Sequence, residues 1–242
     1  EPLYTYDYFA RPAKLAPAAA DGLPEVSADL TTYTIRVKKG LRFADDPAFG
    51  GKPRELTAAD FVYSWKRLLD PKVRSYFVHV FENRLVGADE AIAKARKSGR
   101  FDYDAPIEGL AAVDRYTIRV KFNQPYFGFR HWLTTVTMAP VAREVIEKYG
   151  DASNRVAEHP VGTGPYRLAE WRRSQKIVLE ANPTWRDERY PAPTDPADAA
   201  IAKGLVGRKL PLVPRVEISI VEEAQPRLLS FERGEIDMVD LP

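Results

Sequence analysis

The sequence predicts a mixed α/β protein of the α+β kind, in which helices cover antiparallel sheets. Two segments with the same sequence, YTIRVK at 33–38 and at 116–121, alternate strictly between apolar and polar residues. Such alternation is typical of a strand with one buried face and one wet face. Between them lies a segment, 57–69, whose apolar residues recur at helical spacing. Further strands are expected at 166–170, 176–180 and 215–221.

The composition indicates a folded chain and does not predict a surface that binds nucleic acid. The 242 residues are 45% hydrophobic, which is enough for a core in one or two domains. Lys and Arg together number 36 against 34 Asp and Glu, so no basic surface for nucleic acid is expected. The absence of cysteine excludes disulfides, zinc–thiolate sites and cysteine catalysis. No apolar run approaches the roughly 18 residues that a membrane-spanning helix needs.

Residues 1–158 are expected to form the first part of the chain. Thr57 is a suitable N-cap for the helix at 57–69, with Asp60 three residues on as an acidic variant of the capping box. Two further helices are expected at 89–97 and 141–149. Four aromatic residues crowd the start of the chain, where packing under a covering loop is favoured over ligand contact: Tyr4, Tyr6, Tyr8 and Phe9.

A polar stretch at 151–158 marks the expected boundary to the second part, 159–242, whose strands should form a separate sheet. A glycine turn opens this part, and Gly162 and Gly164 are expected to supply unusual backbone angles. The Pro- and Ala-rich segment 191–214 is interpreted as a surface excursion with a short helix. A last helix should start at Gln225-Pro226, and a final strand is expected at 236–239.

No catalytic or metal site can be assembled from the motifs. The sequence GTGP lacks the third glycine of a dinucleotide fingerprint and the Lys-Ser/Thr of a phosphate loop, and Thr163 stands where a nucleophile turn needs Ser. His79, His131 and His159 are scattered, without metal-ligand spacing. The acidic segment 102–108 lacks the glycine and the third acidic position of a calcium loop. We therefore expect no enzyme activity, no bound metal and no cofactor.

Four motifs follow one another along the chain: YTIRVKKGLRFADD, LTAADFVYSWKRLLDP, PVGTGPYRL…W…KIVLEANPTWR and FERGEIDMV. Together they resemble the family 5 extracellular solute-binding proteins, the peptide-, dipeptide- and nickel-binding components of ABC importers. The resemblance implies part of a two-lobed periplasmic-binding-protein fold of the large peptide-binding type. Residues 1–158 match its extra domain and 159–242 part of its first lobe. The second lobe is absent, so the chain should cover roughly half of the family's length, and 191–214 departs from the common pattern.

The resemblance implies the substrate-binding component of an ABC importer, which captures peptides or similar small solutes outside the inner membrane and delivers them to permease subunits. Two alternatives stay open: a sensor or chaperone without transport on the same fold, and a hydrolase whose catalytic pair lies outside this chain. The chain opens at Glu1 and not at Met, so its ends are not expected to be gene ends. A signal peptide or lipid-anchor cysteine could precede it, and the expected location is the periplasm.

The resemblance also implies a ligand site. In the peptide-binding members a tyrosine just after the helix-ending D-P-K segment reaches the ligand, and Tyr76 stands at the matching place with one residue deleted. A ring with a hydroxyl suits sequence-tolerant binding of peptides. Phe77, Thr163 and Gly164 complete the predicted ligand-binding set. The alternatives are that Tyr76 or Phe77 packs under the following loop, and that the glycine turn is only a sharp bend at a domain crossover.

Overall fold

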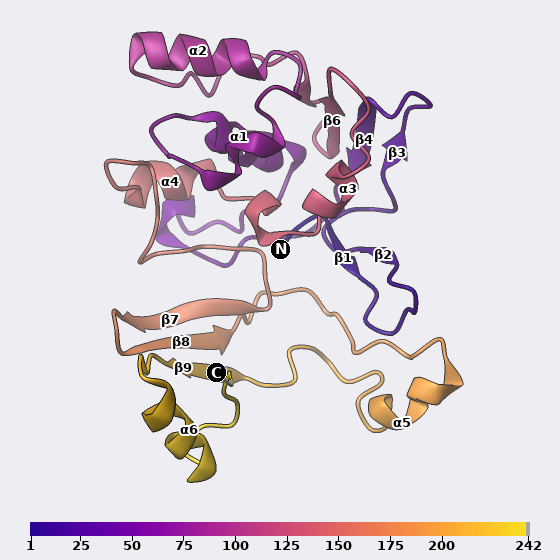
Figure 1. Cartoon of the computed structure of the whole chain (residues 1–242), viewed down its shortest axis with the longest axis vertical. Coiled ribbons are helices and arrows are strands. Elements are labelled where there is room, and N and C mark those ends of the chain that lie inside the picture. Colours follow the sequence, from indigo (N-terminus) through magenta and orange to yellow (C-terminus); the bar gives the residue numbers. More distant parts are fainter. Residues whose placement is uncertain (241–242) are drawn as a thin grey trace.

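The structure, a computed structural model, describes residues 1–240 and consists of two bodies between which the chain crosses once (Figure 1). The helices and strands from residue 4 to residue 149 build the upper body of that view, and those from residue 166 onward build the lower one. Leu241 and Pro242, the last two positions of the predicted 159–242 part, lie outside the described residues.

The upper sheet is antiparallel and contains both YTIRVK segments. Its strands lie in the order β3 (Glu25–Val26), β4 (Thr32–Arg36), β6 (Thr117–Lys121) and β5 (Leu110–Ala112). Ile35 lies opposite Ile118 in the central pair, and Tyr33 lies opposite Val120. All four side chains are buried. The two identical hexapeptides therefore pair with each other and present their apolar sides to the same core, as their alternation predicts.

Helix α1 (Ala58–Leu69) packs against this sheet through the stripe that the sequence predicts. Its first turn is closed by the capping box, because the Asp60 carboxylate accepts a hydrogen bond of 2.8 Å from the Thr57 backbone N–H. Phe61, Trp65 and Leu69 are buried. The other helical segments of the upper body are η1 (Pro47–Phe49), η2 (Tyr76–Val80), α2 (Ala88–Ser98), α3 (Phe129–Trp132), η3 (Val136–Met138) and α4 (Arg143–Tyr149).

Trp65 lies at the centre of a cluster of buried rings. Its indole N–H donates a hydrogen bond of 3.0 Å to the Met138 carbonyl, and its ring centroid lies 5.9 Å from Phe81 and 6.2 Å from Phe129. Phe129 in turn lies 5.1 Å from the ring of Tyr33 on β4. We call this set the aromatic core: Tyr33, Trp65, Phe81, Phe122 and Phe129. It joins helix α1 to the sheet and to the short segments η2, α3 and η3.

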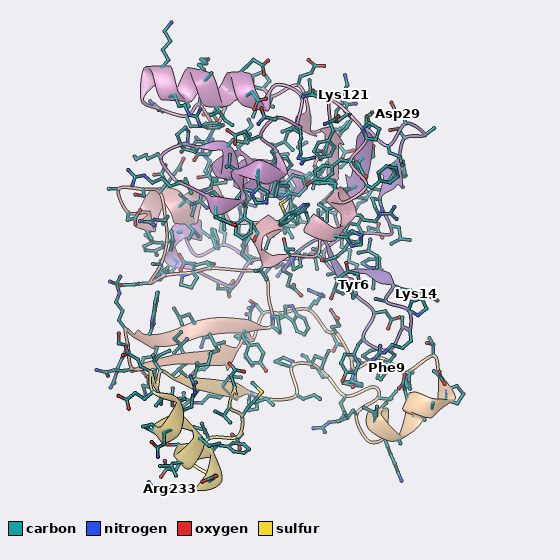
Figure 2. The ribbon with its side chains drawn as sticks, viewed as in Figure 1. Tyr6, Phe9, Lys14, Asp29, Lys121 and Arg233 are labelled. Carbon is teal, nitrogen blue, oxygen red and sulfur yellow. The ribbon has the colours of Figure 1, made fainter. Side chains whose placement is uncertain are left out.

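The aromatic residues at the start of the chain divide between core and surface. They lie on and beside a hairpin of β1 (Tyr4–Tyr6) and β2 (Leu15–Pro17). Tyr4 and Phe9 are buried, whereas Tyr6 is 42% and Tyr8 65% exposed. Phe9 packs edge-on at 6.1 Å against Tyr190, where the hairpin approaches the later excursion of the chain (Figure 2). The packing expected from the sequence is therefore confirmed for two of the four residues.

The lower sheet is separate from the upper one, as the sequence predicts. It is antiparallel, in the order β7 (Tyr166–Arg172), β8 (Lys176–Ala181) and β9 (Arg215–Ser219), and α6 (Ala224–Glu232) follows it. The excursion between β8 and β9 carries η4 (Pro196–Asp198) and α5 (Ala199–Ala202), which lie to one side in Figure 1. The expected short helix in this Pro- and Ala-rich segment is thus confirmed.

Two local expectations for the second part are wrong. Residues 236–239 form no strand, because within residues 1–240 they find no partner strand to pair with. Gly162 and Gly164 do not adopt left-handed backbone angles. The backbone here crosses from one body to the other as an open bend, so it does not need the angles that a tight glycine turn requires.

Asp46 contacts His159, in the segment 150–165 that leads from the upper body to the lower one. Its Oδ2 lies 2.6 Å from His159 Nε2, and its Oδ1 accepts a hydrogen bond of 3.1 Å from the Tyr149 hydroxyl. The rings of Tyr149 and His159 lie tilted against each other, with centroids 4.0 Å apart. Burial raises the pKa of Asp46, but hydrogen bonds from the Ala48 N–H, His159 and Tyr149 outweigh it, so this pKa lies below its ordinary value.

Glu55, just before α1, joins three loops of the upper body. Its carboxylate accepts hydrogen bonds from the Arg115 guanidinium at 2.7 Å, the Gly40 backbone N–H at 2.9 Å and the Tyr116 hydroxyl at 2.9 Å. These hydrogen bonds stabilise the ionised form and lower the pKa of Glu55 from 4.5 to about 2. The charged carboxylate therefore stabilises the folded state.

We predict that Glu55→Gln lowers the melting temperature at pH 7, and that this difference depends on pH. Because the folded-state pKa is depressed, the contribution of Glu55 is full above pH 4.5 and is lost as the pH falls toward 2. Thermal unfolding of both proteins between pH 2 and 7 measures the gap, with the exposed Glu90→Gln as control. A gap that stays constant with pH would contradict the assignment.

Candidate ligand-binding surface

A single turn, η2, carries both Tyr76 and Phe77. The turn begins at Ser75, whose hydroxyl oxygen accepts a hydrogen bond of 3.2 Å from the Phe77 N–H, and it is anchored at its end by the buried Val80. This leaves the Tyr76 ring 83% exposed. The ring makes edge contacts with Phe77 at 5.5 Å and with His79 at 5.9 Å.

Trp132, at the end of α3, lies against the same turn. Its ring centroid is 5.4 Å from His79 and 6.2 Å from Phe77. The neighbours Phe129 and Leu133 are buried, so the backbone of α3 is fixed to the core while Trp132 stays half-buried at its outer side. We call these four residues the aromatic surface: Tyr76, Phe77, His79 and Trp132.

The aromatic surface offers apolar area together with a few neutral polar groups. Its rings carry a phenol hydroxyl, an indole N–H and an imidazole, and none of its members is a carboxylate. Beside Trp132, His131 Nδ1 lies 2.6 Å from the Tyr6 hydroxyl of β1. Rings of this kind recognise a ligand by stacking and by hydrogen bonds without selecting for fixed charge. The arrangement favours binding over catalysis.

Thr163 and Gly164 lie elsewhere, at the junction of the two bodies. Thr163 is 3% exposed, and its hydroxyl oxygen accepts a hydrogen bond of 3.0 Å from the Glu1 nitrogen. The Glu1 carboxylate accepts two hydrogen bonds from Arg186, of 2.6 and 2.9 Å. The Gly164 carbonyl accepts one of 3.1 Å from the Asn182 side chain. Thr163 also lines a hollow of about 200 Å³ that Arg42, Thr184, Trp185 and Arg186 help to enclose.

The predicted site residues therefore form two pairs. Within residues 1–240, no hydrogen bond or ring contact joins Tyr76 or Phe77 to Thr163 or Gly164. The alternative to ligand contact was that Tyr76 or Phe77 packs under the following loop. Phe77 is half-buried and packs against Trp132, whereas Tyr76 is exposed and does not pack in this way. Trp132 could not be found from the sequence, and His79 gave only a weak signal by lying three residues after Tyr76.

Other classes of site find no support in the part of the chain that the structure describes. Residues 1–240 contain no group of three or more His, Asp or Glu side chains placed to hold a metal ion. The acidic segment 102–108 accordingly forms no such cluster. Among the described helices, none has both the length and the apolar character needed to cross a membrane.

Comparison with known proteins identifies the family of the chain. The model of the bacterial extracellular solute-binding proteins, family 5, matches residues 14–242. The probable deoxycholate-binding periplasmic protein YgiS of Escherichia coli is 29% identical over 202 residues, which are 80% of this chain and 35% of YgiS. The periplasmic oligopeptide-binding protein OppA of Salmonella typhimurium is 31% identical over 160 residues, 66% of this chain and 27% of OppA.

Solved structures share the mixed α/β fold. The structure of Burkholderia pseudomallei OppA is 25% identical with a TM-score of 0.69, covering 98% of this chain and 39% of that chain. The complex of Haemophilus influenzae OppA with the peptide RPPGFSPFR gives the same identity, TM-score and coverage.

The chain thus spans well under half the length of these proteins, less than the resemblance implied. These relatives are named for binding and not for catalysis. With the family model matched over 14–242, the chain belongs to the bacterial extracellular solute-binding proteins of family 5.

Proposed function

We propose that these residues are part of the substrate-binding component of an ABC importer, which captures peptides or similar small solutes outside the inner membrane and delivers them to permease subunits. The observation that carries the proposal is the family match over residues 14–242. Relatives named as periplasmic oligopeptide-binding proteins support the ligand class and the periplasmic location.

The aromatic surface supports this ligand class on physical grounds. A peptide importer must accept many sequences, so it needs contacts that do not depend on one particular side chain. The exposed ring of Tyr76 supplies a face for apolar side chains and a hydroxyl for a backbone group of the peptide. Phe77 and Trp132 extend the apolar area beside it. We propose that Tyr76 and Phe77 contact the ligand directly.

Mass spectrometry of small molecules released from the complete gene product tests the ligand class. The protein should be purified without denaturation and then unfolded, so that bound solutes are released and identified. Peptides are expected in amounts that approach the amount of protein. A released compound of another class, such as a bile acid, would keep the binding role and refute the peptide assignment.

We predict that Tyr76→Ala weakens peptide binding about five- to thirty-fold, because one neutral hydrogen bond and some contact area, together about 1–2 kcal/mol, are lost. Calorimetric titration of the complete gene product with the tripeptide Ala-Phe-Ala measures the change. Since Tyr76 is 83% exposed, the melting temperature should hardly move. The control is Tyr8→Ala, which removes another exposed tyrosine outside the aromatic surface. Unchanged affinity in Tyr76→Ala would refute its role.

For Thr163 and Gly164 we propose a positioning role: Thr163 holds Glu1, whose carboxylate binds Arg186 of the hollow, and the Gly164 carbonyl holds the Asn182 side chain. Thr163→Val should lower the free energy of unfolding by about 1 kcal/mol or more, because the partly buried Glu1 nitrogen loses its acceptor. Urea unfolding measures this, with the exposed Thr5→Val as control. An equal change in both variants would argue against the role of this hydrogen bond.

A further inference from the structure

Beyond the aromatic surface, His79 also lines a polar hollow of about 290 Å³. Its other walls are Glu82, Asn83, Arg84 and Gln124. His79 therefore lies between two different environments: on one side the rings of Tyr76 and Trp132, on the other side a hollow with two exposed amides and two charged groups. A ligand that rests on the rings would extend past His79 into this hollow.

The floor of the hollow is held in place by the core. Phe81, Leu85 and Phe122 are buried within two residues of those that line it. A backbone bridge pairs Leu85 with Phe122, and the Asn123 N–H donates a hydrogen bond of 2.7 Å to the Arg84 carbonyl. These contacts tie the turn after η2 to the end of β6. The hollow is thus a fixed feature between two anchored turns.

The two charged residues of the hollow each contact a residue that does not line it. The Arg84 guanidinium lies over the ring of Tyr126, 4.8 Å from its centroid. A carboxylate oxygen of Glu82 lies 3.8 Å from the guanidinium of Arg96 on α2. The formal charges of the two lining residues also cancel each other. The hollow is therefore suited to a neutral polar group better than to an ion.

The hydrogen bond of His79 determines what its ring offers a ligand. Its Nδ1 lies 3.0 Å from the Tyr76 carbonyl oxygen. A carbonyl oxygen can only accept, so Nδ1 carries the hydrogen and donates it. In the neutral ring, Nε2 then has a lone pair and no hydrogen. His79, which lines the hollow, consequently has a hydrogen-bond acceptor available for a ligand.

We propose that His79 and the hollow form a subsite for a ligand side chain that has a flat apolar body and a neutral hydrogen-bond donor at its end, above all the phenol of tyrosine. The ring of the ligand lies on Tyr76 and Trp132, and its hydroxyl donates to His79 Nε2. The amides of Asn83 and Gln124 are close enough to the hollow to pair with the hydroxyl oxygen. This inference rests on the proposed peptide-binding function.

Two peptides that differ by one hydroxyl test the subsite. Ala-Tyr-Ala and Ala-Phe-Ala are titrated calorimetrically at pH 8 into the complete gene product. The wild type should bind the tyrosine peptide about five-fold more tightly, the size of one neutral hydrogen bond. His79→Phe should remove this preference, so that the ratio of its affinities for the two peptides falls to about one, whatever its affinity for Ala-Phe-Ala. His79→Gln, which restores an acceptor, should retain part of it, and the exposed His131→Phe should leave it unchanged.

The outcomes separate this inference from the proposed function. Equal affinity of the wild type for the two peptides, or a preference that survives in His79→Phe, would overturn the subsite while leaving peptide binding in place. Binding of other peptides but of neither probe would overturn it as well. Failure to bind any peptide would instead overturn the proposed function, and the subsite with it.

Discussion

The packing of Trp65 is the constraint on which the rest of the upper body depends. Its indole contacts Phe81 and Phe129 and holds the Met138 carbonyl by a hydrogen bond. These three residues lie in or directly after η2, α3 and η3, segments of three to five residues. Helices this short have no stability of their own in water. Their positions, and those of the rings they carry outward, therefore come from helix α1 and its buried indole.

This dependence explains how the backbone at Tyr76 and Trp132 is positioned although both side chains reach the surface. Each lies a few residues from a buried anchor, Val80 in one case and Phe129 in the other. A ligand that binds to a surface fixed from below loses little free energy to the ordering of protein side chains. The His79 hollow benefits in the same way, because its walls belong to turns that end in the aromatic core.

Local patterns were sufficient to predict most of the elements. Helix α1 combines a capping box with an apolar stripe, and the two YTIRVK strands alternate cleanly, so both could be predicted from the sequence. The prediction of a strand at 236–239 was wrong because a segment forms a strand only where the edge of a sheet is available for pairing. The prediction of unusual backbone angles at Gly162 and Gly164 was wrong because an open bend does not need left-handed angles.

The candidate site was less accessible from the sequence. Tyr76 and Phe77 were found through their place after a recognisable motif and not through any periodic pattern. The contact of Trp132 with His79 joins segments that lie far apart along the chain, and an aromatic residue at the end of a short helix is usually part of a core. Only the fold brings these rings together on one surface. The contacts of Thr163 with Glu1, and of Glu1 with Arg186, were equally hidden, since the three residues lie at distant positions in the sequence.

The exposure of Tyr76 has a consequence for hydration. A ring that is 83% exposed keeps a shell of water over apolar area in the free protein. When a ligand covers the ring, this water returns to the bulk solvent, and the heat capacity of the system falls. The enthalpy of association should therefore become more favourable as the temperature rises. That dependence on temperature distinguishes a ligand that covers the rings from one that is held only by polar contacts.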